Sequence, residues 1–195
     1  MITTEDIKAL REKTGVSVMQ CKKALEEAGG DMDKALVLLH KLSSAIAAKK
    51  ADRELGAGIV EAYKHNSGTV GAMVELLCET DFVAKNTEFR ALAYDIAMHI
   101  AATAPAYLSM NDVTLEERTK AEDAFKKEVD ESDKPADIKA KMLEGKVAGY
   151  LKERVLLEQP FIKNPDITIG GLVDQAVQKF GEKTQIGRFA RFSIE

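Results

Sequence analysis

Residues 58–78 read GIVEAYKHNSGTVGAMVELLC, and this stretch decides the fold class. Two runs rich in β-forming residues, 58–65 and 69–78, are separated by Asn66-Ser67-Gly68. Such runs around an Asn- and Gly-containing turn are typical of a β-hairpin. Because helical patterns flank the hairpin on both sides, we predict an α+β fold with a small antiparallel sheet packed with helices.

Five further segments with a regular pattern follow the hairpin. An apolar stripe from Phe89 to Ile100 predicts a helix that ends before Pro105. Residues 114–130 favour a charged, solvated helix in which Leu115, Ala124, Phe125 and Val129 are available to face a core. A helix starting at Pro135, a short helix near 172–180 and an alternating segment with Ala190, Phe192 and Ile194 complete the chain. We expect the last segment to be a strand that completes the sheet.

Residues 1–42 predict a compact bundle of three short helices. Thr3, Ser17 and Asp31 each stand where an N-cap is needed, and glycines at 15 and 29–30 stand where the first two helices should stop. Residues 43–55 have helix propensity but few large apolar groups, which indicates an exposed helical linker. We therefore divide the chain into a three-helix domain at 1–42, a linker at 43–55 and a core domain at 56–195.

The composition is that of a globular protein without a nucleic-acid or membrane role. Apolar residues make up 45% and charged residues 31% of the 195 residues. The 28 basic and 32 acidic residues give a net charge of −4, without a basic block to neutralise a phosphate backbone. No apolar stretch is long enough to span a bilayer, and Met1 leads into polar residues rather than an apolar signal core. We expect a cytoplasmic protein, or one of the stroma or matrix if organellar.

Motifs of enzyme chemistry are missing from the sequence. It contains no glycine-rich phosphate loop, zinc-binding helix or serine elbow, so we expect no enzyme, no cofactor and no metal site. Cys21 and Cys78 lie within apolar patterns that favour buried reduced thiols, with a disulfide as the alternative. A small enzyme using Asp81, His99 and Cys78 is a rival hypothesis, but Cys78 has no adjacent base in the sequence.

Residues 80–85 form the most informative loop. Thr80 can cap a helical turn, Asp81 suits its N-terminus, and Asp81 and Lys85 have the spacing of a helical ion pair. Phe82 leaves two interpretations open. Its ring could pack into the core, or it could be an exposed aromatic anchor beside a carboxylate that enters a partner's pocket.

The motifs of the chain resemble those of the elongation factor Ts family. Residues 80–85, TDFVAK, match the signature of that family and stand between the same hairpin and helix. The other matching motifs occur in the expected order along nearly the whole chain: REKTG at 11–15, CKKAL at 21–25, MHIAA at 98–102, QPF at 159–161 and RFARF at 188–192. The resemblance implies that the N-terminal helices form a ubiquitin-associated-like module.

The resemblance also implies a function in translation elongation. The family acts as a guanine-nucleotide exchange factor that binds elongation factor Tu with GDP, promotes GDP release and is displaced by GTP. By analogy, Asp81 and Phe82 would disrupt the partner's magnesium and nucleotide site. Thr80, Val83, Ala84 and Lys85 would support them in the loop. The residues expected to bind the partner elsewhere are Arg11, Val18, Met19, Lys22 and His99, although a buried structural role for His99 is equally open.

Departures from the family pattern affect details. Ser17, Val18 and Asn86 stand where the family often has Gly, Met and Asp. Longer family members repeat the sheet-and-helix core, whereas this chain has room for one unit. Short members of the family compensate by pairing, so the resemblance implies a homodimer that forms a 2:2 complex with elongation factor Tu. A remaining alternative is that the N-terminal module serves as a different peptide adaptor.

Overall fold

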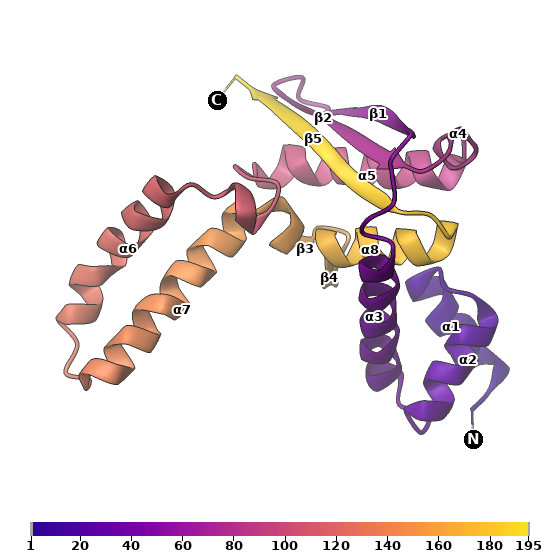
Figure 1. Cartoon of the computed structure of the whole chain (residues 1–195), viewed down its shortest axis with the longest axis horizontal. Helices are drawn as coiled ribbons and strands as arrows, with labels where there is room; N and C mark the ends of the chain where they lie inside the picture. Colours follow the sequence, from indigo (N-terminus) through magenta and orange to yellow (C-terminus); the bar gives the residue numbers. More distant parts are fainter. Residues whose placement is uncertain (1, 195) are drawn as a thin grey trace.

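The computed structural model describes residues 2–194 and confirms an α+β fold with an N-terminal helical bundle (Figure 1). Within these residues, strands β1 (Ala57–Lys64), β2 (Val70–Cys78) and β5 (Thr184–Ser193) form an antiparallel sheet in the order β1-β2-β5. The predicted hairpin and the predicted closing strand are both confirmed, and β5 begins several residues before the alternating segment. A register shift opposite Glu75 and Leu76 leaves Gly187 unpaired and marks a bulge in the edge strand β5.

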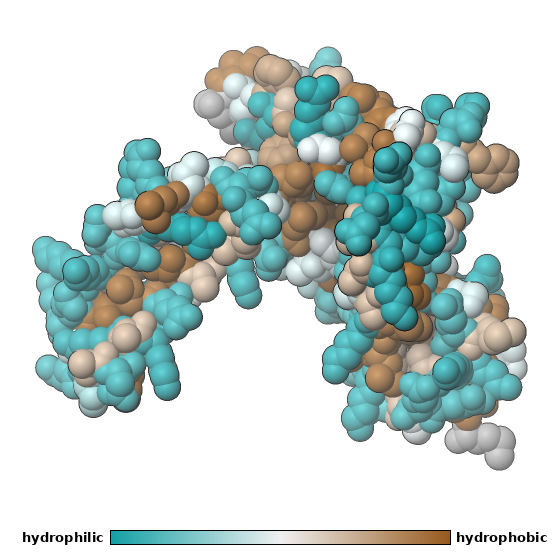
Figure 2. Space-filling model, viewed as in Figure 1, coloured by the Kyte–Doolittle hydropathy of each residue, from teal (hydrophilic) through white to brown (hydrophobic). Residues whose placement is uncertain are grey.

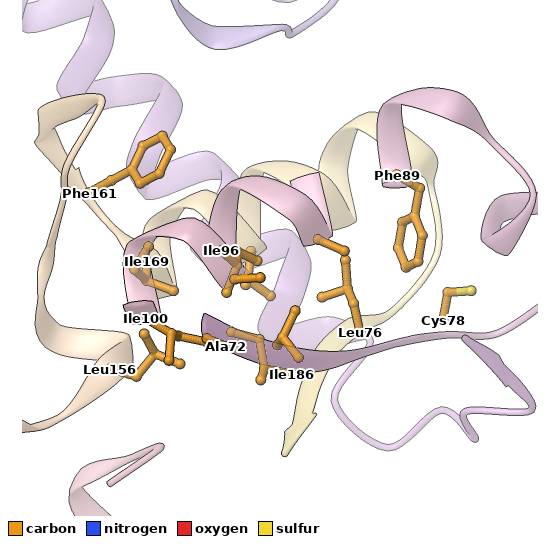
Figure 3. Close-up of a cluster of buried hydrophobic side chains, with 14 of the residues drawn as sticks. Ala72, Leu76, Cys78, Phe89, Ile96, Ile100, Leu156, Phe161, Ile169 and Ile186 are labelled. Atoms are coloured by element: carbon orange, nitrogen blue, oxygen red, sulfur yellow. The ribbon is translucent and has the colours of Figure 1, made fainter. Parts of the chain in front are cut away.

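One face of the sheet carries the core. Helices α5 (Thr87–Thr103) and α8 (Ile169–Phe180) pack against it, because alternate residues of each strand point towards them. Removing these apolar side chains from water is the main force holding the layers together. The core includes the residues labelled in Figure 3, namely Ala72, Leu76, Cys78, Phe89, Ile96, Ile100, Leu156, Phe161, Ile169 and Ile186.

The opposite face of the sheet is open. Val60 is 61% exposed, Met73 46% and Phe192 69%, one on each of the three strands. The pairing register aligns Gly71 with Phe192 and Met73 with Ala190, so these side chains share a face. Figure 2 shows apolar surface along the strand layer at the top of the view. We call the face formed by Val60, Met73 and Phe192 the open sheet face.

The N-terminal bundle consists of α1 (Thr4–Thr14), α2 (Val18–Glu27) and α3 (Met32–Lys49). Their predicted caps are confirmed. Each N-cap side chain, of Thr3, Ser17 and Asp31, accepts a hydrogen bond from the backbone N–H three residues later. The bundle has its own core of fully buried residues, among them Leu10, Cys21, Leu25, Ala35 and Leu39.

Most of the segment after residue 42 is exposed, but its start is anchored. Helix α3 continues as far as Lys49, and Ser43 is 1% exposed. The Ser43 hydroxyl lies against the side-chain oxygen of Gln178 on α8, and the Ser44 hydroxyl donates to Asp174 at 2.6 Å. The predicted helical linker is therefore exposed over most of its length, whereas two serine hydroxyls anchor its start to α8. The division at 1–42, 43–55 and 56–195 stays a prediction.

Helices α6 (Leu115–Asp130) and α7 (Ala136–Arg154) form a long hairpin that projects away from the sheet (Figure 1). Phe125 and Tyr150 meet edge to face between them, with ring centroids 6.0 Å apart. The solvated character predicted for α6 is confirmed, since most of its residues are exposed. Of the apolar residues available to face a core, Val129 is buried, whereas Leu115 is 80% exposed.

Short elements connect the hairpin to the sheet. The 3₁₀ turn Met110–Asp112 precedes α6, and a second one, Leu156–Glu158, follows α7. Strands β3 (Pro160–Phe161) and β4 (Asn164–Thr168) then form a small ribbon that leads into α8.

Both cysteines are free and buried, which confirms the prediction of reduced thiols. No helix within residues 2–194 combines the length and the apolar character that a membrane crossing requires.

Candidate partner-binding site

Residues 80–85 form a projecting tip at the end of the central strand. Strand β2 ends at the buried Cys78, and one turn of helix, α4 (Asp81–Ala84), follows almost at once. Val83 and Ala84 are each 6% exposed and belong to the core of the sheet domain. Because these two residues anchor the turn from inside, the residues before them face outward.

Phe82 points into solvent. It is 84% exposed, the largest exposed fraction among the large apolar side chains of residues 2–194. The interpretation that its ring packs into the core is therefore wrong, and the exposed aromatic is confirmed. A phenyl ring left in water on an anchored turn has an unfavourable hydration that a partner's pocket would remove.

Asp81 is held next to Phe82 by the predicted ion pair. Lys85 Nζ lies 2.5 Å from Asp81 Oδ2, and both side chains are about three-quarters exposed. The hydrogen bond from Lys85 lowers the pKa of the Asp81 carboxyl, so it is ionised at neutral pH. A surface pair of this kind adds little to stability, but it keeps a negative charge beside the exposed ring.

Thr80 does not cap the turn with its side chain, contrary to the sequence-based expectation. Its backbone has N-cap geometry, but its hydroxyl makes no capping hydrogen bond. The hydroxyl instead donates to Glu182 Oε1 at 2.6 Å, and the Thr80 N–H donates to Glu182 Oε2 at 3.0 Å. Donation to the Glu182 carboxylate directs the Thr80 side chain away from the N–H groups that it would accept from as a cap.

A second exposed surface lies on the N-terminal bundle. Val18 and Met19, in the first turn of α2, are 54% and 81% exposed. Arg11 and Lys22 are exposed as well, and Lys22 lies 3.8 Å from Glu26 in a helical ion pair. Two neighbouring apolar side chains bordered by cations are suited to binding a protein surface.

His99 is fully buried, with no exposed surface for direct contact with a partner. Its Nε2 donates to Gln159 Oε1 at 2.9 Å, and its Nδ1 accepts from the N–H of Ile162 at 3.4 Å. Burial lowers the pKa of the ring, which is therefore neutral at pH 7. Its surroundings match the structural role that the sequence left open.

The buried His99 predicts a pH dependence of stability. Because its folded pKa lies below the ordinary value of 6.5, the folded protein resists the proton that the unfolded chain accepts. The free energy of unfolding should therefore fall as pH drops from 7.5 through 6.5 to 5.5, by up to about 1.4 kcal/mol per pH unit. Urea unfolding across this range measures the slope. The idea is wrong if His99→Gln keeps the slope of the parent chain.

Cys78 lacks the features of a nucleophile. Burial raises the pKa of its thiol, and the Glu182 carboxylate raises it further. The thiol donates to the carbonyl oxygen of Thr80 at 3.2 Å, which is a structural contact. These features speak against the rival hypothesis of an enzyme using Cys78 and the buried His99.

Comparison with known proteins bears on the whole chain. A sequence model of the family described as elongation factor TS matches residues 33–195. The elongation factor Ts of Carboxydothermus hydrogenoformans is 49% identical over 100% of this chain and 89% of its own length. The proteins of the same name from Heliobacterium modesticaldum and Thermodesulfovibrio yellowstonii are each 46% identical, over 100% and 99% of this chain and 90% and 96% of their lengths. With its motifs, its fold and these similarities, the chain belongs to the elongation factor Ts family.

Proposed function

We propose that this protein is a guanine-nucleotide exchange factor for elongation factor Tu and acts by binding rather than by bond-making chemistry. It binds Tu with GDP, promotes release of the GDP and is displaced by GTP. The observation that carries the proposal is the tip, where Phe82 is 84% exposed beside an ionised Asp81 in a chain of this family.

The tip suits the disruption of a nucleotide site. Phe82 would insert its ring into an apolar pocket of the partner, where removal from water favours binding. Asp81 would then lie near the loops that hold the partner's magnesium ion. Because Mg²⁺ demands near-ideal octahedral geometry, a small displacement of those loops loosens both the ion and the phosphates.

Exchange follows from the coupling between two binding events. If the factor weakens GDP binding, GDP must weaken binding of the factor by the same ratio. The partner's nucleotide-free state is the one to which the tip is complementary, and incoming GTP reverses the association. This exchange requires neither a covalent step nor a cofactor bound to the exchange factor.

The N-terminal bundle provides the second attachment. Arg11, Val18, Met19 and Lys22 would contact the partner's nucleotide domain away from the tip. Two attachments hold the partner while Phe82 enters, so that part of the binding energy can offset the lost phosphate contacts. Figure 1 places α1 and α2 on the same side of the molecule as α4, with the α6–α7 hairpin on the other.

The direct test measures release of a fluorescent GDP analogue from elongation factor Tu in excess unlabelled nucleotide. The chain at micromolar concentration should accelerate release by at least about 100-fold, equivalent to an activation barrier for release that is lower by about 3 kcal/mol. A release rate that the chain leaves unchanged would contradict the proposed function.

We further propose that the protein acts as a homodimer, paired through the open sheet face. Exposed apolar side chains from all three strands form that face, around the central Met73. A second copy offers the same surface, so a two-fold axis would bring two such faces together and cover them. The resulting pair would carry two tips and bind two copies of elongation factor Tu.

A further inference from the structure

The tip is bonded to the connection between α8 and β5, which lies 102 residues further along the chain. Both oxygens of the Glu182 carboxylate are used, one by the N–H and one by the hydroxyl of Thr80. Two bonds from one residue to one carboxylate fix its orientation as well as its distance. Thr80 is the first residue of the tip and immediately precedes Asp81, so this contact fixes the position of the start of the tip.

A reciprocal contact lies beside it. Glu79 accepts a hydrogen bond from the N–H of Lys183 at 2.5 Å, and Arg53 Nη1 lies 3.2 Å from both Glu79 oxygens. The side chain of Glu79 is only 21% exposed, and the hydrogen bond from Lys183 lowers its pKa. Thr80 therefore donates hydrogen bonds to Glu182, and Glu79 accepts one from Lys183.

The same connection is tied to the end of the N-terminal helices. Lys183 Nζ donates to the carbonyl oxygens of Ala51 at 2.6 Å and Arg53 at 2.9 Å, just after α3. The Lys50 ammonium group contacts the carbonyl oxygen of Gly181. A continuous set of polar contacts thus joins the end of α3 to the base of the tip. We call Arg53, Glu79, Thr80, Glu182 and Lys183 the bracket.

The tip needs such outside support. Helix α4 has four residues, and a single turn of this length is not stable by itself in water. Its N-cap side chain makes no capping bond, so the turn is held by the buried Val83 and Ala84 on one side and by Glu182 on the other. Removal of the Glu182 carboxylate takes away both the contact of the Thr80 hydroxyl and the partner of its N–H, so the start of the turn is held less firmly.

We propose that Glu182 is a positioning residue that holds the Asp81–Phe82 tip at a set orientation relative to the N-terminal bundle. The inference rests on the proposed exchange function and extends it to a residue far from the tip in sequence. Glu182 contacts Thr80 and, through it, orients Phe82; it does not itself contact the partner. Its loss should therefore reduce the rate at which bound partner releases GDP and leave the strength of the first association, made by the N-terminal bundle, nearly unchanged.

The test is a titration of GDP release with the full chain and its Glu182→Ala variant. The maximal release rate should fall about tenfold, whereas the half-saturating concentration should change less than about twofold. Glu88→Ala is a matched control, because Glu88 also joins two elements, in an ion pair with Lys179 at 2.9 Å, but lies outside the bracket. The control should release GDP at the rate of the parent chain.

A double-variant cycle separates positioning from a general structural effect. In a chain that already carries Phe82→Ala, Glu182→Ala should cause a clearly smaller further loss, because the ring that it positions is missing and only Asp81 remains. An equal loss in both backgrounds would overturn the proposal, as would a change confined to the half-saturating concentration. Thr80→Val removes one bond of the pair at an exposed position and should lower the maximal rate two- to fourfold, which keeps the test decisive if Glu182→Ala does not fold.

The outcomes distinguish the bracket from the proposed function itself. If the parent chain does not accelerate GDP release, the exchange function fails and the bracket fails with it. A second outcome is that the parent chain is active and Phe82→Ala is impaired, but Glu182→Ala keeps the maximal rate. In that case only the bracket is overturned.

Discussion

Replacement of Phe82 by alanine is expected to reduce stimulated GDP release from elongation factor Tu by one to two orders of magnitude. A buried aromatic at the centre of an interface contributes about 2 kcal/mol or more, and about 1.4 kcal/mol changes a rate tenfold. Because the ring is 84% exposed in the chain alone, its removal should cost the fold almost nothing. Stopped-flow fluorescence of a labelled GDP measures the rate.

A matched control makes this result specific. Leu115→Ala removes an apolar side chain that is 80% exposed on the α6–α7 hairpin, away from the tip. It should leave GDP release unchanged. Circular dichroism and the mass of the Phe82→Ala protein should match those of the parent chain. Undiminished exchange by folded Phe82→Ala would contradict the role given to the tip.

A charge placed at Met73 is expected to separate the dimer into single chains. Met73 lies on the central strand β2, between Ala62 and Ala190 in the register, and is 46% exposed in a single chain. In a dimer paired through the open sheet face, Met73→Glu would bury an unpaired carboxylate in each subunit. A charge of that kind costs about 3–5 kcal/mol, which weakens association more than 100-fold.

Light scattering at micromolar concentration distinguishes the two states. The parent chain should have twice the mass of one chain, and the Met73→Glu protein the mass of one. Ile138→Glu is the control, because Ile138 on α7 is 41% exposed and lies outside the open sheet face. A parent chain that is already monomeric would contradict the dimer, and a dimeric Met73→Glu protein would contradict the surface assigned to it.

Local signals predicted most of the secondary structure. N-cap side chains, the turn at Asn66-Ser67-Gly68 and the alternation in β2 and β5 all act between residues close in sequence, so each could be interpreted without the rest of the chain. The ion pair between Asp81 and Lys85 was predicted for the same reason, since four residues make one turn of helix.

The features that the sequence did not reveal are contacts between distant segments. Helix propensity predicted a helix beyond residue 42, but not its contacts with Gln178 and Asp174 of α8. Whether Leu115 would face a core depended on how α6 meets α7, and whether His99 would be buried depended on Gln159 and the β3 ribbon.

By itself, the sequence determined an α+β chain with a three-helix bundle, a hairpin and a TDFVAK loop, because helix caps, turns and periodicity are properties of neighbouring residues. Only the tertiary structure decided that Phe82 faces solvent, because its exposure depends on Val83 and Ala84 entering the core. It also decided that Thr80 bonds to Glu182 rather than capping its own turn. A carboxylate 102 residues away becomes a neighbour only when β5 pairs with β2, and no local pattern carries that information.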